Sequence, residues 1–547
     1  MRAPTNDAAG GPPGAPAWGR PDTRVAAGLF AGLFALYVIT GFAGIRSPDS
    51  EVAFETCEAL AHGRGFALGP ASTLRDFGHA RGVDGREYSI FGPAQPLVCA
   101  PLLAAVDALL GEGSPPARLS PNPSFYTGDG LRRFALRQGS AGPEYREHVR
   151  RALVAAAFNP LLTALGAALF FALCRRFAGR SASAAAALVY GTASLAWPYA
   201  GTFFSEPLAT LFVLGALLAA AWARGPGGFA ASGTLAGLAV TAHVSTATFL
   251  PFVPWMAIGG TPRSTPSMPA ARDAGAPSAL RASLRRLARE RWLPYALGAG
   301  AVLLALGAFH QAHWGDPFET GRWADPERAR AFAHGTAVAP GQGLYGLLFG
   351  AGKGVFLYCP VVLLGLLGFR ALAHRDRAFA WALGAAVVAR LVFVATRSDW
   401  HGGYSLGPRL LVEAIPWLLV PLAPWLDDLV RAGRRAAAGA VLAAGWLAAV
   451  QQACFVVRDP FTAMHTVAQL ARMQGFEPTV RDMYLDWSFA PLLRWDSTRR
   501  APWLLQGWGV PDGVLVAGLA ALLALVYLLA GRALLARAAA PERGSLR

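Results

Sequence analysis

The chain has 547 residues, of which 54% are hydrophobic and only 15% are charged. Soluble proteins carry roughly 25% charged residues, so the composition excludes an ordinary soluble enzyme. A net charge of +16 is also found in nucleic-acid-binding proteins, but here the basic residues lie in short loops between apolar runs instead of one patch. We therefore expect a membrane protein in contact with lipids and without a nucleic-acid partner.

The N-terminal segment 1–23 is rich in glycine and proline and is expected to be a disordered cytoplasmic segment. The first expected helix, 24–45, contains an apolar run from Val25 to Ile45 that follows Arg20 and Arg24. This run is longer than the roughly 7–15 residues of a signal-peptide core, so we expect a retained membrane anchor. Five cysteines lie far apart without a CxxC pair, which supports neither a zinc site nor a disulfide framework.

Further apolar runs follow along the chain, most of them long enough for the roughly 20 residues that a bilayer demands. They predict an all-α integral membrane protein with about 12 transmembrane helices and a module extending over 24–531. The expected helices are 24–45, 150–174, 181–199, 205–223, a pair within 229–258 divided near His243–Ser245, 293–312, 354–372, 379–397, 410–430, 437–457 and 513–531.

Arginines crowd the short loops between these runs, and the positive-inside rule places such loops in the cytoplasm. With an even number of crossings, both termini are cytoplasmic, including the tail at 532–547. Three large loops then lie outside, at 46–149, 313–353 and 458–512. The run 91–110 contains three prolines, so we expect short interfacial or re-entrant helices in the first outer loop there, not a spanning helix. The crowded arginines are Arg175, Arg176, Arg180, Arg370, Arg375, Arg377, Arg431, Arg434 and Arg435.

Two acidic residues, Asp49 and Glu51, follow the first apolar run and are expected at the outer membrane surface. A carboxylate there can act as a general base within reach of a lipid head group. Two carboxylates this close can also share a divalent cation, Mg²⁺ or Mn²⁺, or one of them can keep its proton. The alternative is an ordinary helix start, with Ser47 or Asp49 as N-cap and acids in the first turn.

Lys353 and Arg409 each precede an apolar helix that is expected to descend from the outer face. Cations beside free N–H groups at a helix start form a seat for a phosphate at head-group depth. The alternative is interface anchoring by long side chains. Lys353 does not belong to a nucleotide-binding P-loop, because no Ser or Thr follows it.

Arg390 lies inside an apolar run. A charge inside the membrane is functional by default, although pairing with Glu413 or Glu206 would make it structural. His401 is a candidate acid–base or metal-binding group, without a spacing that supports either role.

The chain resembles the GT-C glycosyltransferases, in particular bacterial relatives of the protein O-mannosyltransferases and the aminoarabinose–lipid A transferases. The matching features are Asp49 and Glu51 after the first helix, Asp84-Gly85-Arg86 with Tyr88 before a Pro-rich apolar piece, and a hairpin of short helices at 229–258. The segments Gly-Lys-Gly…Tyr-x-x-Pro at 352–360 and Trp-His-Gly-Gly-Tyr-Ser-Leu-Gly-Pro-Arg at 400–409 also resemble stretches of bacterial members. The acids differ from the family's adjacent pair because one residue separates them.

The resemblance implies inverting transfer of a hexosyl or pentosyl group from a polyprenyl-phosphate donor on the outer face of a bacterial cytoplasmic membrane. The acceptor would be a hydroxyl of an envelope glycan, lipid or protein. Asp49 would be the general base and Glu51 would support it or hold a divalent ion. The residues expected to bind the substrates, including the departing lipid phosphate, are Asp84, Arg86, Tyr88, Lys353, Arg390, His401 and Arg409.

Two other kinds of function remain open from the sequence. A transporter or flippase of a lipid-linked or amphipathic substrate would place ionisable groups near the middle of the membrane, whereas most polar residues here gather at one face. A ligase or polymerase of lipid-linked glycans would use the same face and similar cations. A purely structural scaffold would not need so many acidic and basic groups on the outside.

Overall fold

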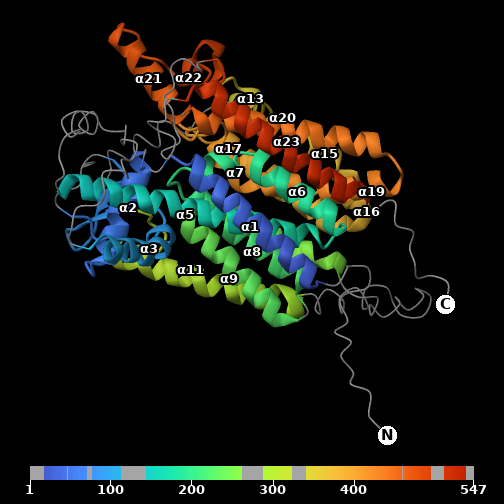
Figure 1. The fold of residues 1–547 in the computed structure, drawn as a ribbon. Helices are drawn as coiled ribbons and strands as arrows, with labels where there is room; N and C mark the ends of the chain where they lie inside the picture. The colour runs from blue at the N-terminus through green and yellow to red at the C-terminus, as the bar shows by residue number, and fades with distance from the viewer. Residues whose placement is uncertain are drawn as a thin grey trace.

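The computed structural model describes residues 18–42, 44–45, 47–69, 77–111, 143–223, 225–260, 288–322, 340–458, 460–493 and 510–536. Figure 1 shows that most of these residues are helical. Residues 1–17 of the N-terminal segment that was expected to be disordered lie outside the described residues. The same holds for most of the loop 260–292, which precedes the expected helix 293–312, and for the tail from residue 537. The tail residues 532–536 belong to the last helix.

Seven helices among the described residues are long and apolar enough to cross a bilayer. The protein is thus a multi-pass, all-α membrane protein, as the composition predicted. These spans are α1 (Arg20–Thr40), α5 (Pro143–Cys174, apolar from Val149), α11 (Leu293–Trp314, with the π-turn Ala288–Trp292 before it), α17 (Arg377–Ala395), the segment Arg409–Arg431, α20 (Arg435–Val457) and α23 (Asp512–Ala536).

Several expected spans are shorter or interrupted in the structure, so the seven spans found among the described residues do not confirm the expected twelve. The run 354–372 forms α14 (Val355–Tyr358), α15 (Val362–Leu367) and the start of α16 (Phe369–Arg375). The first break falls at Cys359-Pro360, because a residue before proline disfavours the helical conformation and Cys359 has φ −144° and ψ 58°. The other short elements of this kind are α6 (Arg180–Ala193), α7 (Ala196–Ala200), α8 (Glu206–Trp222), the 3-10 helix η4 (Arg409–Ala414), α18 (Ile415–Leu419) and α19 (Leu422–Arg431). Helix α13 (Pro340–Phe349) lies within the expected outer loop 313–353.

The predicted interruption near His243 is present. Helix α9 (Pro226–Ala242) ends at His243, and the chain continues as two 3-10 helices, η1 (Val244–Phe249) and η2 (Val253–Gly260). The second of these packs against α8 and α17. The two short α-helices expected here are therefore one α-helix followed by tighter 3-10 turns.

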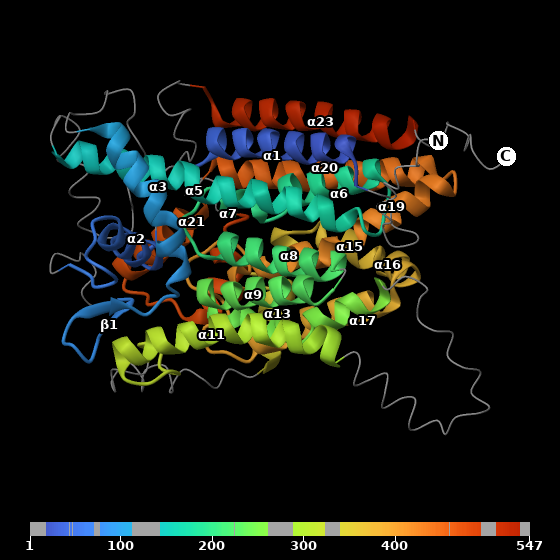
Figure 2. The ribbon, with the colours of Figure 1, turned by 90° about the horizontal axis from the view of Figure 1, so that it is seen from below.

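The helices run side by side in a layered bundle, with α23 and α1 along one edge and α11 along the opposite edge in Figure 2. Only 17%, 11% and 11% of the apolar windows of α1, α11 and α23 are buried within the protein, against 67% for α5 and 78% for Arg409–Arg431. An apolar helix that is not covered by protein is covered by lipid in a membrane. Helices α1, α11 and α23 thus face the bilayer, and α5 and Arg409–Arg431 form the centre.

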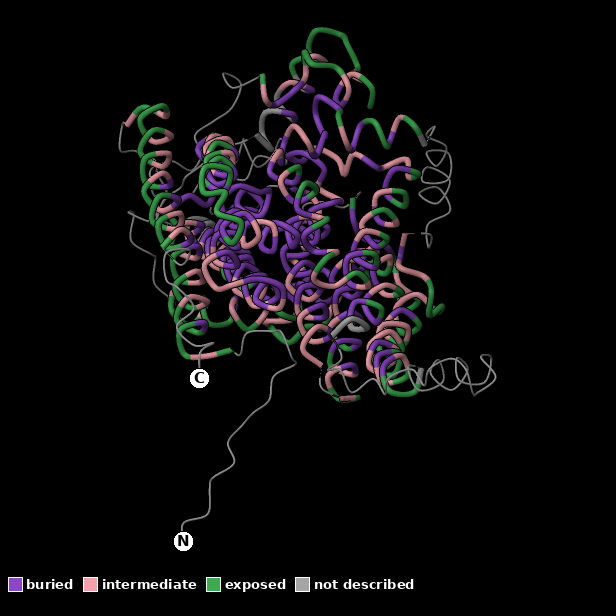
Figure 3. The backbone as a smooth tube through the Cα atoms, turned by 90° about the vertical axis from the view of Figure 1, so that its right-hand side faces the viewer, coloured by how far each residue is buried: buried purple, intermediate pink, exposed green. Residues whose placement is uncertain are grey.

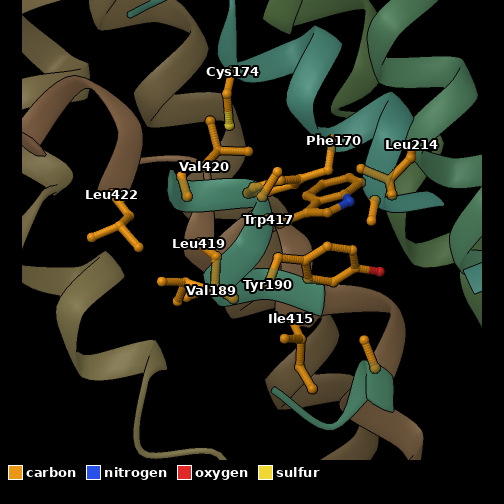
Figure 4. Close-up of a cluster of buried hydrophobic side chains, with 14 of the residues drawn as sticks. Phe170, Cys174, Val189, Tyr190, Leu214, Ile415, Trp417, Leu419, Val420 and Leu422 are labelled. Atoms are coloured by element: carbon orange, nitrogen blue, oxygen red, sulfur yellow. The ribbon is translucent and has the colours of Figure 1, made fainter. Parts of the chain in front are cut away.

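Buried side chains gather in the middle of the bundle, as the burial colouring in Figure 3 shows. Figure 4 shows part of this core, in which the rings of Trp417, Tyr190 and Phe170 lie close together. They come from α18, α6 and α5, so the core joins segments that are far apart in the sequence. This rigid centre carries the loops at both ends of the bundle.

One end of the bundle collects the polar elements of the first large loop, and we call it the α2 end. It contains α2 (Pro48–Ala61), α3 (Ala94–Leu110) and a two-stranded antiparallel sheet of β1 (His79–Arg81) and β2 (Glu87–Ser89), as Figure 2 shows. Arg150 of α5 contacts Glu58 of α2 and Asp107 of α3, which ties these helices to the bundle. Helices α21 (Pro460–Met473) and α22 (Val480–Leu485) and the 3-10 turn Trp487–Phe489 follow later in the chain.

The run 91–110, expected as an interfacial or re-entrant piece, forms the regular helix α3 with Pro101 inside it. Helix α3 packs against α2 and α5. It is apolar, but with 17 residues it is shorter than the seven helices that could span a membrane. The β1–β2 hairpin was not predicted. Its register pairs His79 with Ser89 and Arg81 with Glu87.

Glycines allow α9 and α11 to approach closely. A Cβ atom on Gly233 would lie 1.9 Å from the carbonyl oxygen of Tyr295, and a Cβ atom on Gly298 would lie 2.1 Å from that of Ala230. Small residues at such crossings let the backbones of membrane helices pack directly. Gly300, two residues further along α11, has nothing within 4 Å of the position of a Cβ atom.

We predict opposite effects of alanine at these two positions of α11. Gly298→Ala should lower the stability by roughly 1–3 kcal/mol, because the new methyl group forces the helices apart. Gly300→Ala should leave the stability unchanged or raise it by up to ~1 kcal/mol through helix propensity. Thermal unfolding of both variants in the same detergent measures the difference. Equal shifts for the two would contradict the close helix crossing.

Candidate functional site

The candidate site begins at the first turn of α2. Ser47 is the N-cap, and its side chain accepts a hydrogen bond from the backbone N–H of Ser50 at 3.1 Å. Asp49 and Glu51 both lie in the first turn, where the helix dipole stabilises negative charge. The capping arrangement considered from the sequence is therefore present, with Ser47 as the cap.

The two acids of this turn have different partners. Asp49 accepts a hydrogen bond from Nη1 of Arg409 at 2.7 Å. Glu51 is buried and forms an ion pair with Arg151 of α5, which also holds Glu147 at 2.7 Å. Asp49 is the more exposed of the two carboxylates, at 24% of its side chain against 7%. The two acids therefore have different surroundings, and Asp49 is the one that is more accessible to solvent.

Arg409 is held on three sides. Its Nε donates to Glu206 at 2.5 Å, its Nη1 donates to Asp49 at 2.7 Å, and its guanidinium carbon lies 3.8 Å from the ring centroid of Phe204. We call these four residues the Arg409 cluster. A guanidinium stacked on an aromatic ring and bonded along two edges has little freedom to rotate. Arg409 is therefore a cation whose position is fixed in advance by the other three residues of the cluster.

Buried amides fix the segment that supplies Phe204 and Glu206. The side-chain amide of Asn159 in α5 donates to the carbonyl oxygens of Thr202 and Phe204, at 2.7 and 2.9 Å. Gln95 of α3 donates to the carbonyl oxygen of Phe203 at 2.7 Å. Sequence reasoning missed this support, because an amide inside an apolar run gives no signal of what it contacts.

The loop before Arg409 is fastened from inside the protein. Nζ of Lys353 donates to the carbonyl oxygens of Gly403 and Ser405, at 2.7 and 2.6 Å, and to Oγ of Ser405 at 2.9 Å. The hydroxyl of Tyr199 donates to the carbonyl oxygen of Leu406 at 2.8 Å. Gly407 adopts φ +57°, and a Cβ atom there would lie 2.8 Å from Cβ of Tyr358. These contacts set the direction in which the chain enters η4.

Lys353, expected in a phosphate seat, is fully buried. Its three acceptors belong to the loop, and its ammonium group lies 5.0 Å from the ring centroid of Tyr484. Burial and the neighbouring charge of Arg409 hold the pKa of Lys353 well below its usual value. In this arrangement Lys353 supports the loop that carries Arg409, and its role at a phosphate stays a prediction.

Arg390 is also fully buried and pairs with Glu413 at 3.0 Å. Its Nε donates to the carbonyl oxygen of Leu410 at 3.0 Å, and Glu413 accepts a second bond from His243 at 2.6 Å. These contacts favour the structural alternative, in which Glu413 is the partner of Arg390. Leu410 and Glu413 both lie in η4, so Arg390 fastens the turn that begins with Arg409.

Further charges lie near the Arg409 cluster. Arg397 and Asp399 form a two-pronged ion pair, with both oxygen–nitrogen distances 2.6 Å. Burial raises the pKa of Asp399, but the hydrogen bonds from Arg397 outweigh it and bring the pKa below its usual value. Burial and Arg397 lower the pKa of Arg322, while Asp399 and Asp49 act in the opposite direction. Arg322 therefore lies within electrostatic range of Asp49, which the sequence pattern did not indicate.

His401 stacks on the ring of Tyr484, with centroids 4.4 Å apart and planes at 16°. Its Nδ1 accepts a hydrogen bond from the backbone N–H of Gly403 at 3.0 Å. Burial and the charge of Lys353 lower the pKa of His401 to about 4. A neutral His401 therefore helps to join α22 to the loop before Arg409.

The remaining predicted substrate-binding residues form the β1–β2 hairpin. The hydroxyl of Tyr88 donates to Asp84 at 2.6 Å, and Arg86 lies 3.5 Å from the same carboxylate. The ring of Tyr88 packs against His313 at the end of α11, 4.3 Å away between centroids. The contacts described for Asp84, Arg86 and Tyr88 are thus with one another and with α11, and their role in substrate binding stays a prediction.

The carboxylates at 49 and 51 were candidate ligands for a divalent cation. Each instead has a guanidinium as its partner, and Glu51 is buried behind Arg151. Among the described residues, no group of three or more His, Cys, Asp or Glu side chains lies close enough to hold a metal ion. The residues of this turn therefore do not fit a metal site as they stand.

No family model matches the chain, and no curated protein matches its sequence. Among solved structures, the chain is similar to ArnT from Cupriavidus metallidurans bound to undecaprenyl phosphate, with a TM-score of 0.44, 14% identity, and 94% of this chain covering 77% of that one. The apo state of the same protein gives a TM-score of 0.41 and 16% identity, with 94% and 76% of the two chains covered. The archaeal oligosaccharyltransferase AglB from Archaeoglobus fulgidus, in complex with an inhibitory peptide and a dolichol-phosphate, gives 0.39 and 11%, with 95% and 56% covered.

The low identities and TM-scores mean that the helices superpose only in part. The function of this chain therefore depends on what its own residues can do.

We predict that Lys353 is protected in the folded protein. It is the only lysine of the chain, so a lysine-specific endoprotease can cut at this single position. Because Lys353 is fully buried, the native protein in detergent should stay uncut, and the unfolded chain should give two fragments. Gel electrophoresis of both digests measures this. Rapid native cleavage at 353 would show that the lysine is accessible to a ligand as well.

A second prediction concerns the pH dependence of stability. The pKa of His401 is lowered to about 4 from the ordinary 6.5, so its contribution to stability is complete above pH 6.5 and is lost as the pH falls toward 4. His401→Gln should therefore flatten the loss of stability across this window. The exposed His374→Gln is the matched control and should leave the wild-type curve unchanged. Thermal unfolding at a series of pH values compares them, and parallel curves for wild type and His401→Gln would rule out the buried neutral histidine.

Proposed function

We propose that the protein is a membrane glycosyltransferase that moves a sugar from a polyprenyl-phosphate donor to an acceptor hydroxyl, with inversion, on the extracytoplasmic face. The observation that carries the proposal is the contact of a partly exposed carboxylate, Asp49, with a preorganised cation, Arg409, at the α2 end of the bundle. Transfer of this kind needs a base for the acceptor and a cation for the departing phosphate, next to each other at the membrane surface.

Asp49 would be the base. It removes the proton of the acceptor hydroxyl while the hydroxyl oxygen forms a bond to the anomeric carbon of the donor sugar. The bond from that carbon to the phosphate oxygen breaks, and the phosphate keeps the electron pair. Attack from the side opposite the phosphate inverts the anomeric configuration.

Arg409 would stabilise the phosphate as its negative charge increases. Its planar guanidinium suits phosphate oxygens, and the stacking on Phe204 keeps it in place before the donor arrives. Arg322, within electrostatic range of Asp49 and Arg409, would supply a second positive charge. Lys353 and Arg390, expected earlier as direct phosphate ligands, have their described contacts with the loop and with η4 and would act by holding Arg409.

The charge distribution along the bundle supports the orientation. Arg175 and Arg180 meet Asp22, and Arg375 meets Asp428, in loops that lie at the end of the bundle opposite α2, where Figure 2 shows α16 and α19. Arginine-rich short loops remain in the cytoplasm. The α2 end would then face the extracytoplasmic side, with the Arg409 cluster near lipid head groups of a bacterial cytoplasmic membrane.

The decisive variant is Asp49→Asn, which keeps the size of the side chain and removes the base. Turnover of labelled polyprenyl-phosphate sugars by the purified protein should fall by about 10²–10⁴-fold. Asp512→Asn is a matched control, because Asp512 is also a first-turn aspartate that pairs with an arginine, Arg458, at 2.7 Å. The control should keep its activity. Near-normal turnover by Asp49→Asn would remove Asp49 as the base.

A further inference from the structure

The two carboxylates on Arg409 differ in their contact with solvent. The side chain of Glu206 is completely buried, whereas 24% of the side chain of Asp49 is exposed, and the exposed fraction of Arg409 lies between them at 13%. The Glu206 bond therefore lies on the protein side of the guanidinium, and the Asp49 bond lies on the side that a ligand can reach.

We infer that a phosphate group replaces the Asp49 carboxylate on Arg409, while Glu206 stays bound as the permanent partner and positions the guanidinium. This inference rests on the proposed function, in which the phosphate is carried by the lipid donor. It assigns Glu206 as a positioning residue and Asp49 as an exchangeable partner. Asp49 is then released as a base only when the donor is in place.

Glu206 cannot leave Arg409 without a large penalty. An unpaired buried carboxylate lacks both water and a counter-charge, and Oε2 of Glu206 already has no hydrogen-bond partner. The residue is the first of α8, and the segment before it is held by Asn159 and Gln95. The anchored edge of the guanidinium therefore stays where it is when the other edge changes partner.

Asp49 can leave because its charge keeps other support. It lies in the first turn of α2, whose free N–H groups stabilise a carboxylate without Arg409. A partly exposed ion pair is weak, and a phosphate offers more negative charge and more acceptor oxygens to the same guanidinium. The exchange thus replaces a weak contact by a stronger one.

The exchange makes the base depend on the donor. While Asp49 is bound to Arg409, one of its carboxylate oxygens accepts the hydrogen bond from Nη1 and is not free to accept one from the acceptor hydroxyl. Once the phosphate accepts the hydrogen bond from Nη1 of Arg409, the Asp49 carboxylate no longer holds that bond. It then lies beside the donor sugar and can accept a proton. A site built this way would not activate water before the donor has arrived.

Binding of polyprenyl phosphate, the product lipid without a sugar, tests the exchange without any transfer reaction. The full-length protein in nanodiscs is titrated with this lipid as wild type, Asp49→Asn and Asp512→Asn. Asp49→Asn should bind about fivefold more tightly, because the competing carboxylate is gone. Asp512→Asn is the matched control, a first-turn aspartate that pairs with Arg458 and not with Arg409, so the affinity should stay unchanged.

Unchanged or weaker binding by Asp49→Asn overturns the exchange, and so does equal tightening by Asp512→Asn, which would indicate a general effect of removing negative charge. A double-mutant cycle sharpens the result: in an Arg409→Met background, Asp49→Asn should no longer tighten binding. If the Arg409 variant does not fold, the comparison of Asp49→Asn with Asp512→Asn still decides.

Inorganic phosphate serves as a second ligand and distinguishes the source of the phosphate group. A response to Asp49→Asn with the lipid supports exchange by a lipid-borne phosphate, whereas a response confined to inorganic phosphate overturns that source. The proposed function can fail separately: tighter lipid binding by Asp49→Asn, together with no sugar transfer by the wild type, would keep the exchange and reject the transferase.

Discussion

The ion pairs of Arg409 are the interaction on which the arrangement of the α2 end depends. One guanidinium joins Asp49 at the start of α2 and Glu206 at the start of α8, and it begins η4 itself. Three segments separated by hundreds of residues thus meet at one cation. Because a partly buried arginine must be paired, the chain can bury Arg409 only when these segments come together. The same need fixes the geometry in which a base and a cation lie next to each other.

Charges in this protein are arranged in order of burial along η4. Arg390 and Glu413 are fully buried and satisfy one another, with His243 on the far side of the glutamate. Arg409, four residues before Glu413, keeps 13% of its side chain exposed, and His243 keeps 20%. Lys353 is fully buried and is bonded to the loop that precedes Arg409. Buried charges therefore hold this turn in place, and in the proposed function the contact of Asp49 with Arg409 at the start of the turn carries the chemistry.

The sequence predicted the membrane class and the approximate spans, because long apolar runs have few other structures available to them. It also placed Asp49 and Arg409 on a common side through the arginine-rich loops. It could not predict that Asp49 pairs with Arg409 while Glu51 pairs with Arg151. The sequence shows that the two acids lie on different faces of one helical turn, but it does not show which distant segment packs against each face. The hairpin at 79–89 was missed because its three-residue strands are too short for a periodic pattern. The burial of Lys353 was missed because a glycine-flanked lysine suggests exposure, whereas here the glycines let Tyr484 and the loop close around it.

The separation of the two acids has a consequence for how the turn can work. If Asp49 and Glu51 shared one cation or one proton, each would change whenever the other did. With Glu51 committed to Arg151 inside the protein, the start of α2 is anchored to α5 through one acid, and the other acid is left to respond to ligands. A helix that is fixed by a buried charge can let an exposed one change partner without moving. In the proposed function, the two neighbouring carboxylates therefore divide the work: Glu51 holds the helix and Asp49 takes part in the chemistry.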